Sequence, residues 1–103
     1  PGDHPLMSTL HVLSHSPFGD NRLASCLRVL GNQDALLLCG DATYALHPGS
    51  PPFEVLQAAG VNLFVLAEDL QARALDTPDW AEAINYSGFV ELSIEHDKVN
   101  TWL

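Results

Sequence analysis

The sequence predicts a small α/β protein with three layers, in which a mainly parallel sheet lies between helices. The longest apolar runs, at residues 35–39 and 63–67, do not alternate with polar residues, which is typical of strands covered on both faces in parallel sheets. Amphipathic helical segments separate these runs, as βαβ units require. The chain has 103 residues, of which 47% are hydrophobic and 17% charged, and this is enough for one domain with its own core.

The first strand is expected at Thr9–Leu13, an apolar run that ends before Pro17. Asp20 or Asn21 can cap the helix that follows, and Gly31 is placed to terminate it. The buried face of this helix is expected to carry Leu23, Cys26, Leu27 and Leu30, which are spaced i, i+3, i+4 and i+7.

The later elements follow from the same patterns of periodicity and helix capping. They are strands at 35–39, 61–66 and 80–85, with the last at an edge; helices at 53–59, 69–75 and 88–97; and a possible helical turn at 43–47. Ser87 is expected to cap the closing helix. A tail follows, and we expect its Trp102 to be held in place, with contact to a partner chain favoured over packing within the domain.

Composition excludes several classes of protein. Thirteen Asp and Glu against four Lys and Arg give a net charge of -9, which disfavours direct nucleic-acid binding. Apolar runs are far shorter than the ~20 residues that cross a bilayer, so no membrane span is expected. We interpret residues 1–6 as a remnant preceding a native start at Met7, and 7–103 as a single domain. Two cysteines fit a reducing, cytoplasmic compartment.

The loop at residues 14–21, after the first strand, is where enzymes of this architecture usually bind a cofactor. It has neither GxGxxG nor a P-loop, so no cofactor is expected. The five histidines lack ligand spacing and no CxxC pair occurs, so no metal is expected either. His11, on the first strand, is expected to be a hydrogen-bonded histidine at a packed surface or an interface.

The cysteines are the candidate nucleophiles. Cys26 has Arg22 and Arg28 nearby, and positive charge favours the thiolate that sulfur chemistry requires. The alternative is that Cys26 is a small core residue on the buried helix face, and spacing favours this alternative. Cys39 is expected in the core at a strand end. If either thiol is reactive, Cys26 is the candidate catalytic residue, as a possible persulfide carrier.

Several segments together resemble the DsrH-like family, whose bacterial tRNA-modifying branch is called TusB. The resemblance runs from Leu10 to Trp102 and rests on the order and spacing of many positions. These are Leu10, His11, Leu13, Ser16, Pro17 and Phe18; 35–38 with Asp41; Leu66, Glu68, Asp69, Leu70, Ala72 and Arg73; Tyr86, Phe89, Val90 and Leu92; and Trp102. Two departures affect turns, since Ala42 and Ala74 stand where the family usually has glycine.

The resemblance implies a DsrE-like fold and a role as one subunit of a TusBCD-type heterohexamer, with TusC-like and TusD-like homologous subunits as partners. Such a complex passes persulfide sulfur toward 2-thiolation of the wobble uridine of tRNA. The main accepting cysteine is expected on the TusD-like subunit, so this chain is expected to be a non-catalytic subunit. Alternatives are a DsrEFH-type subunit in sulfur oxidation, or an independent thiol sulfurtransferase using Cys26; other TusB members lack this cysteine.

Overall fold

A computed structural model describes residues 8–102, and the interpretation of residues 1–6 and Met7 lies outside this range. Five strands form one sheet in the order β4-β3-β2-β1-β5, and all four pairings are parallel. The strands are β1 (Thr9–Leu13), β2 (Ala35–Leu38), β3 (Leu63–Leu66), β4 (Glu82–Ile84) and β5 (Lys98–Trp102). The predicted α/β architecture with a mainly parallel sheet is confirmed.

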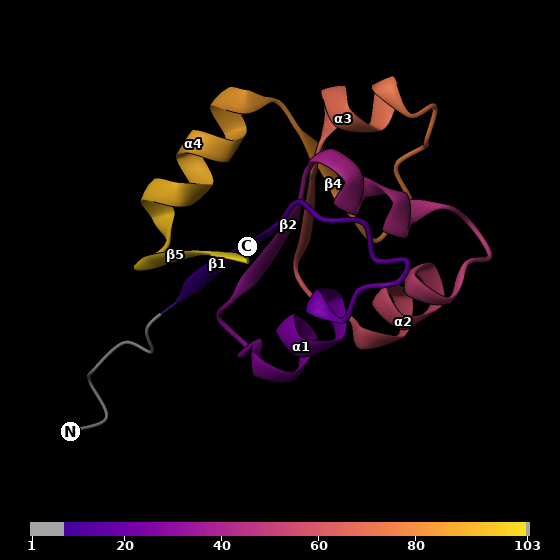
Figure 1. Ribbon diagram of the computed structural model, residues 1–103. Coiled ribbons are helices and arrows are strands. Elements are labelled where there is room, and N and C mark those ends of the chain that lie inside the picture. The colour runs from indigo at the N-terminus through magenta and orange to yellow at the C-terminus, as the bar shows by residue number, and fades with distance from the viewer. Residues whose placement is uncertain (1–7, 103) are drawn as a thin grey trace.

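Helices cover the two faces of the sheet unequally (Figure 1). One face carries α1 (Arg22–Val29), the 3₁₀ helix η1 (Gly40–Leu46), α2 (Pro51–Ala59) and α3 (Ala67–Ala72). The other face carries α4 (Tyr86–Glu95). Side chains alternate along each strand, so the sheet separates two apolar clusters. Leu36 and Leu38 belong to the cluster under α1, and Leu37 packs with Leu92 of α4 on the other side.

Local hydrogen bonds explain where the helices begin. At α1, Asp20 rather than Asn21 provides the side-chain acceptor, because its Oδ1 accepts from the N–H of Arg22 at 2.7 Å. The helix expected at 53–59 begins earlier, at Pro51, since proline is tolerated in the first turn and Ser50 caps the Phe53 N–H. The segment of the possible helical turn, 43–47, lies in η1 up to Leu46, and His47 is the residue that ends this helix.

The predicted cap of the closing helix is wrong. Asn85 accepts a hydrogen bond from the N–H of Gly88 at 2.8 Å, and α4 begins at Tyr86, so Ser87 lies inside the first turn. Asparagine caps helices as well as serine does. Because Asn85 is the cap, α4 begins and ends two residues earlier than expected.

The tail is the largest difference between the predicted and observed elements. Residues Lys98–Trp102 form β5, which pairs in parallel with β1 from Thr9↔Lys98 to Leu13↔Trp102. The indole of Trp102 packs against the cluster under α1 and is partly buried. Trp102 is therefore held in part by its own domain, which was the alternative to the favoured partner contact, and contact of its exposed part with a partner stays a prediction.

Candidate functional site

Cys26, the candidate sulfur carrier, lies in the core. It is fully buried on the inner face of α1. Burial, together with the nearby negative charge of Asp34, raises the pKa of the Cys26 thiol to about 12. Arg28 is exposed and Arg22 forms an ion pair with Asp20, so neither arginine offsets the burial. A reactive thiol needs a lowered pKa and access to its donor, and the folded chain provides neither at Cys26.

Cys39 follows β2 at the carboxyl edge of the sheet, where open α/β sheets usually place their sites. Its side chain is partly buried, and Sγ donates to the Leu13 carbonyl at 3.5 Å. Burial, and after it the charge of Asp69, raises the pKa of this thiol as well. Both cysteines of the chain are free, and both are held as protonated thiols at neutral pH.

Beside Cys39, a charged cluster joins η1 to α3. Asp69 accepts from the N–H of Gly40 at 2.8 Å, which fixes the turn after β2. Arg73 donates to Asp41 at 2.8 Å and to the Asp69 carbonyl at 3.0 Å, and its guanidinium lies 5.5 Å from the centre of the Tyr44 ring. These hydrogen bonds join α3 to η1, so the cluster stabilises the packing of these two helices at the carboxyl edge of the sheet.

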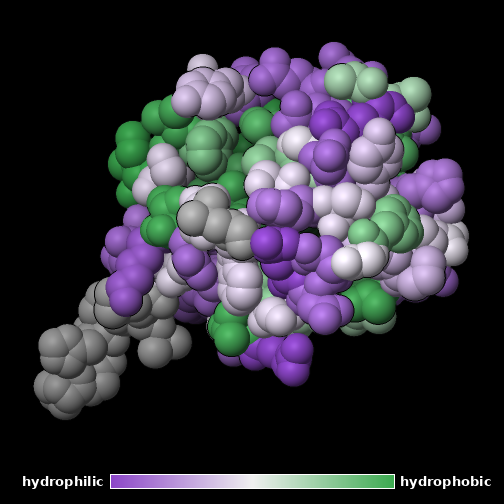
Figure 2. Space-filling view, in the orientation of Figure 1, coloured by the Kyte–Doolittle hydropathy of each residue, from purple (hydrophilic) through white to green (hydrophobic). Residues whose placement is uncertain are grey.

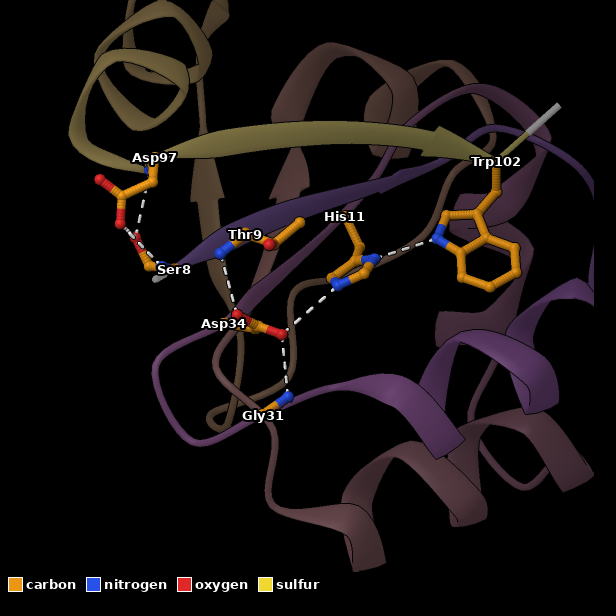
Figure 3. A network of polar contacts seen from close by, with 7 residues as sticks. All are labelled: Ser8, Thr9, His11, Gly31, Asp34, Asp97 and Trp102. Carbon is orange, nitrogen blue, oxygen red and sulfur yellow. Dashed lines mark hydrogen bonds and ion pairs between the residues drawn. The ribbon is translucent and has the colours of Figure 1, made fainter. Parts of the chain in front are cut away.

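A second polar network runs along β1 (Figure 3). It extends from Trp102, which pairs with Leu13 at the carboxyl edge of the sheet, to Asp34 in the turn before β2. Trp102 Nε1 donates to His11 Nδ1 at 3.1 Å, and His11 Nε2 lies 3.5 Å from Asp34 Oδ2. Because the indole N–H can only donate, His11 Nδ1 must be unprotonated, and the proton of the neutral ring is on Nε2, facing Asp34. His11 is buried, which confirms the expectation of a hydrogen-bonded histidine at a packed surface.

Asp34 completes this network by binding the backbone. Its carboxylate accepts from the N–H of Thr9 at 2.9 Å and of Gly31 at 2.8 Å. The network therefore ties together β1, the turn before β2 and the end of β5. Its partners are far apart in the sequence, and no local motif signals them. Both nitrogens of His11 are already engaged, so this histidine is not available as a general base.

The part of the chain that the structure describes contains no group of three or more His, Cys, Asp or Glu residues that could hold a metal ion. Within residues 8–102, no helix is both long and apolar enough to span a membrane. The polar groups described above join segments of the chain to one another.

The fold defines the chain as an α/β protein of a known class. The ychN protein from E. coli, known from a crystal structure, matches with a TM-score of 0.75 over 94% of this chain and 100% of that protein, at 21% identity. The family model described as DsrH like protein matches residues 15–99. The chain therefore belongs to the DsrH-like family.

Similar relatives carry the name TusB. Protein TusB of Erwinia tasmaniensis is 38% identical over 95 residues, which cover 90% of this chain and 99% of that protein. Protein TusB of Klebsiella pneumoniae strain 342 is 37% identical over the same shares of the two chains. The family predicted from the scattered positions of the sequence is confirmed.

Proposed function

We propose that this chain is the TusB-type subunit of a cytoplasmic sulfur relay complex that passes persulfide sulfur toward 2-thiolation of the wobble uridine of tRNA. The observation that carries the proposal is the similarity to TusB proteins over 99% of their length, at 37–38% identity. Partners in this complex are a TusC-like and a TusD-like homologous subunit, in a heterohexamer.

Within the complex, the chain acts as a non-catalytic subunit. Burial and the raised pKa of about 12 make Cys26 a poor acceptor of persulfide sulfur, because the attacking species is the thiolate. The accepting cysteine is then supplied by a partner subunit. An independent sulfurtransferase based on Cys26 would need the helix to open first.

A second candidate is a DsrEFH-type subunit in sulfur oxidation, which the name of the matching family model favours. The two roles share a fold and differ in the acceptor of the sulfur. They are separated by the product, which is thiolated tRNA in one case and oxidised sulfur in the other.

Genetic complementation tests the proposal. The chain is expressed with the TusC-like and TusD-like chains of its own organism in a bacterium that lacks all three native subunits, and 2-thiouridine in tRNA is measured by mass spectrometry. We expect thiolation to return only when all three chains are present, and to persist with Cys26→Ser. Assembly of the three chains without any thiolated tRNA would favour the sulfur-oxidation role.

A further inference from the structure

The face of the sheet under α4 is incompletely covered by this chain. A ten-residue helix is about 15 Å long and about 10 Å wide, whereas five strands at ~4.8 Å spacing extend over about 20 Å. The opposite face has α1, η1, α2 and α3 (Figure 1). Parallel sheets occur almost only where both faces are covered. The single helix α4 therefore covers its side of the sheet only in part.

Large apolar side chains are exposed on that same side. On α4, Tyr86 is 65% exposed, Val90 40% and Ile94 77%, at four-residue intervals along one stripe. On β5, Val99 is 46% exposed and pairs in register with Leu10, whose side chain packs with Leu92 of α4. We call these four residues the α4 surface. Figure 2 shows apolar residues gathered over α4 at the upper left.

Acidic residues border the α4 surface. Glu91 and Glu95 are exposed on α4, and Glu82 of β4 pairs with Phe64, whose side chain is on the α4 side of the sheet. The four basic residues of the chain lie elsewhere, at Arg22, Arg28, Arg73 and Lys98. Arg22 and Arg28 are on α1, Arg73 ends α3, and Lys98 pairs with Thr9, on the α1 side of β5.

We propose that the α4 surface is the docking site for a different protein chain, one that presents an apolar face bordered by Lys or Arg. A second copy of this chain is a poor occupant, because a two-fold contact would bring Glu91 and Glu95 against like charges with no basic residue to offset them. The proposal rests on the proposed function, within which the occupant is a homologous subunit of the relay complex.

The test compares two matched substitutions. Ile94→Asp places a charge on the α4 surface, and Val29→Asp does the same on α1, where Val29 is 59% exposed. Both sites lie near a helix C-terminus, so the cost of an acidic residue to helix stability is similar. Thermal midpoints of the two variants should therefore agree, and any difference in binding reports on the surface.

Binding to the purified TusC-like and TusD-like subunits, separately and mixed, is measured by titration calorimetry. We expect Ile94→Asp to raise the Kd at least about 30-fold and Val29→Asp less than threefold. Combined Glu91→Lys and Glu95→Lys should also raise the Kd, and the wild-type Kd should rise with salt, because the border contacts are between opposite charges.

The outcomes separate the two proposals. Failure of the wild-type chain to bind any subunit would overturn the proposed function and the docking site with it. Normal assembly in which Ile94→Asp behaves like Val29→Asp would overturn the docking site alone. A wild-type homodimer that Ile94→Asp dissociates would show that a second copy is the occupant, and the charge argument would be wrong.

Discussion

Asp34 is the residue on which three segments of the chain depend. Burial alone would raise the pKa of its carboxyl group, but the hydrogen bonds from the Gly31 and Thr9 N–H groups and from His11 outweigh burial, and the pKa lies below its usual value. A lowered pKa in the folded state means that the ionised carboxylate stabilises the fold. This contribution is complete above about pH 4, the ordinary range of an aspartate, and is lost as the pH falls through the lowered value.

Asp34→Asn should therefore lower the free energy of unfolding by about 2 kcal/mol at pH 7, the range for hydrogen bonds to a charged group. The difference from the wild type should shrink as the pH falls below about 4, because the unfolded chain then takes up the Asp34 proton before the folded chain does, and it should vanish once the pH is below the lowered pKa of the folded state. Urea denaturation at a series of pH values measures both effects. A variant as stable as the wild type at pH 7 would contradict this role for the network.

Cys26 allows a second test at the level of one residue. A pKa of about 12, against an ordinary 9.0, leaves about a thousandth of the usual thiolate, and burial blocks the reagent as well. In a Cys39→Ser background, iodoacetamide at pH 7.5 should alkylate Cys26 at least about 100-fold more slowly in the native protein than in urea. Rapid native labelling would restore Cys26 as a candidate carrier.

At the level of elements, the end of α3 has a non-glycine residue with a positive φ angle. Ala74 has φ 54°, in the left-handed region that favours glycine. Its N–H donates to the Gln71 carbonyl, and the N–H of Leu75 donates to the Leu70 carbonyl, which is the Schellman pattern. The Schellman turn is thus made with alanine in place of the glycine that this conformation favours, at a cost in backbone strain.

Ala74→Gly should remove about 1 kcal/mol of backbone strain from the folded state. Because glycine also increases the conformational entropy of the unfolded chain, the net gain in the free energy of unfolding should be about 0.5 kcal/mol. Ala72→Gly, at the last residue of α3, where φ is negative, is the matched control and should lower stability by up to about 1 kcal/mol. Thermal denaturation of the two variants gives opposite signs if the turn is as described. Two losses of similar size would contradict it.

Local patterns predicted the elements that carry strong apolar periodicity. β1 matches its predicted bounds, and the strands expected at 35–39 and 61–66 are observed at Ala35–Leu38 and Leu63–Leu66. β5 was missed because it lies at an edge, where four of its five residues are exposed and no apolar alternation marks it. Its pairing with β1, and with it the bond from Trp102 to His11, depends on contacts that no local window contains.

The revised place of the tail changes what a truncation should do. Removing residues 101–103 deletes two of the five register pairs between β1 and β5, and the Trp102 hydrogen bond. We expect the free energy of unfolding to fall by about 3 kcal/mol and the thermal midpoint by more than 10 °C. Trp102→Phe, which keeps most of the ring but loses the donor, should cost about 1 kcal/mol. An unchanged midpoint after truncation would mean that the tail is held by a partner.

For the whole molecule, the side chains that take no part in internal contacts indicate where a partner could bind. Cys26 is buried and Cys39 partly buried, and the charged clusters around Asp34 and Arg73 bind segments of the chain to one another. The apolar and acidic features that remain lie at the surface. Composition alone predicted the acidic surface. The unequal covering of the two sheet faces could be predicted only from the topology, because α4 connects the edge strand β4 to the opposite edge strand β5.

The same charge distribution predicts how the isolated chain behaves toward the proposed end substrate of its complex. The net charge is -9, and two of the four basic residues, Arg22 and Arg73, form ion pairs with Asp20 and Asp41. Binding to tRNA requires several phosphates to be neutralised, so we expect no micromolar binding of the isolated chain in a gel shift at about 150 mM salt. The assembled complex is the control, because any tRNA binding it shows must then come from the partner subunits. Micromolar binding by the isolated chain would contradict this prediction. It would mean that tRNA contacts this subunit through a local basic surface, despite the net charge of -9.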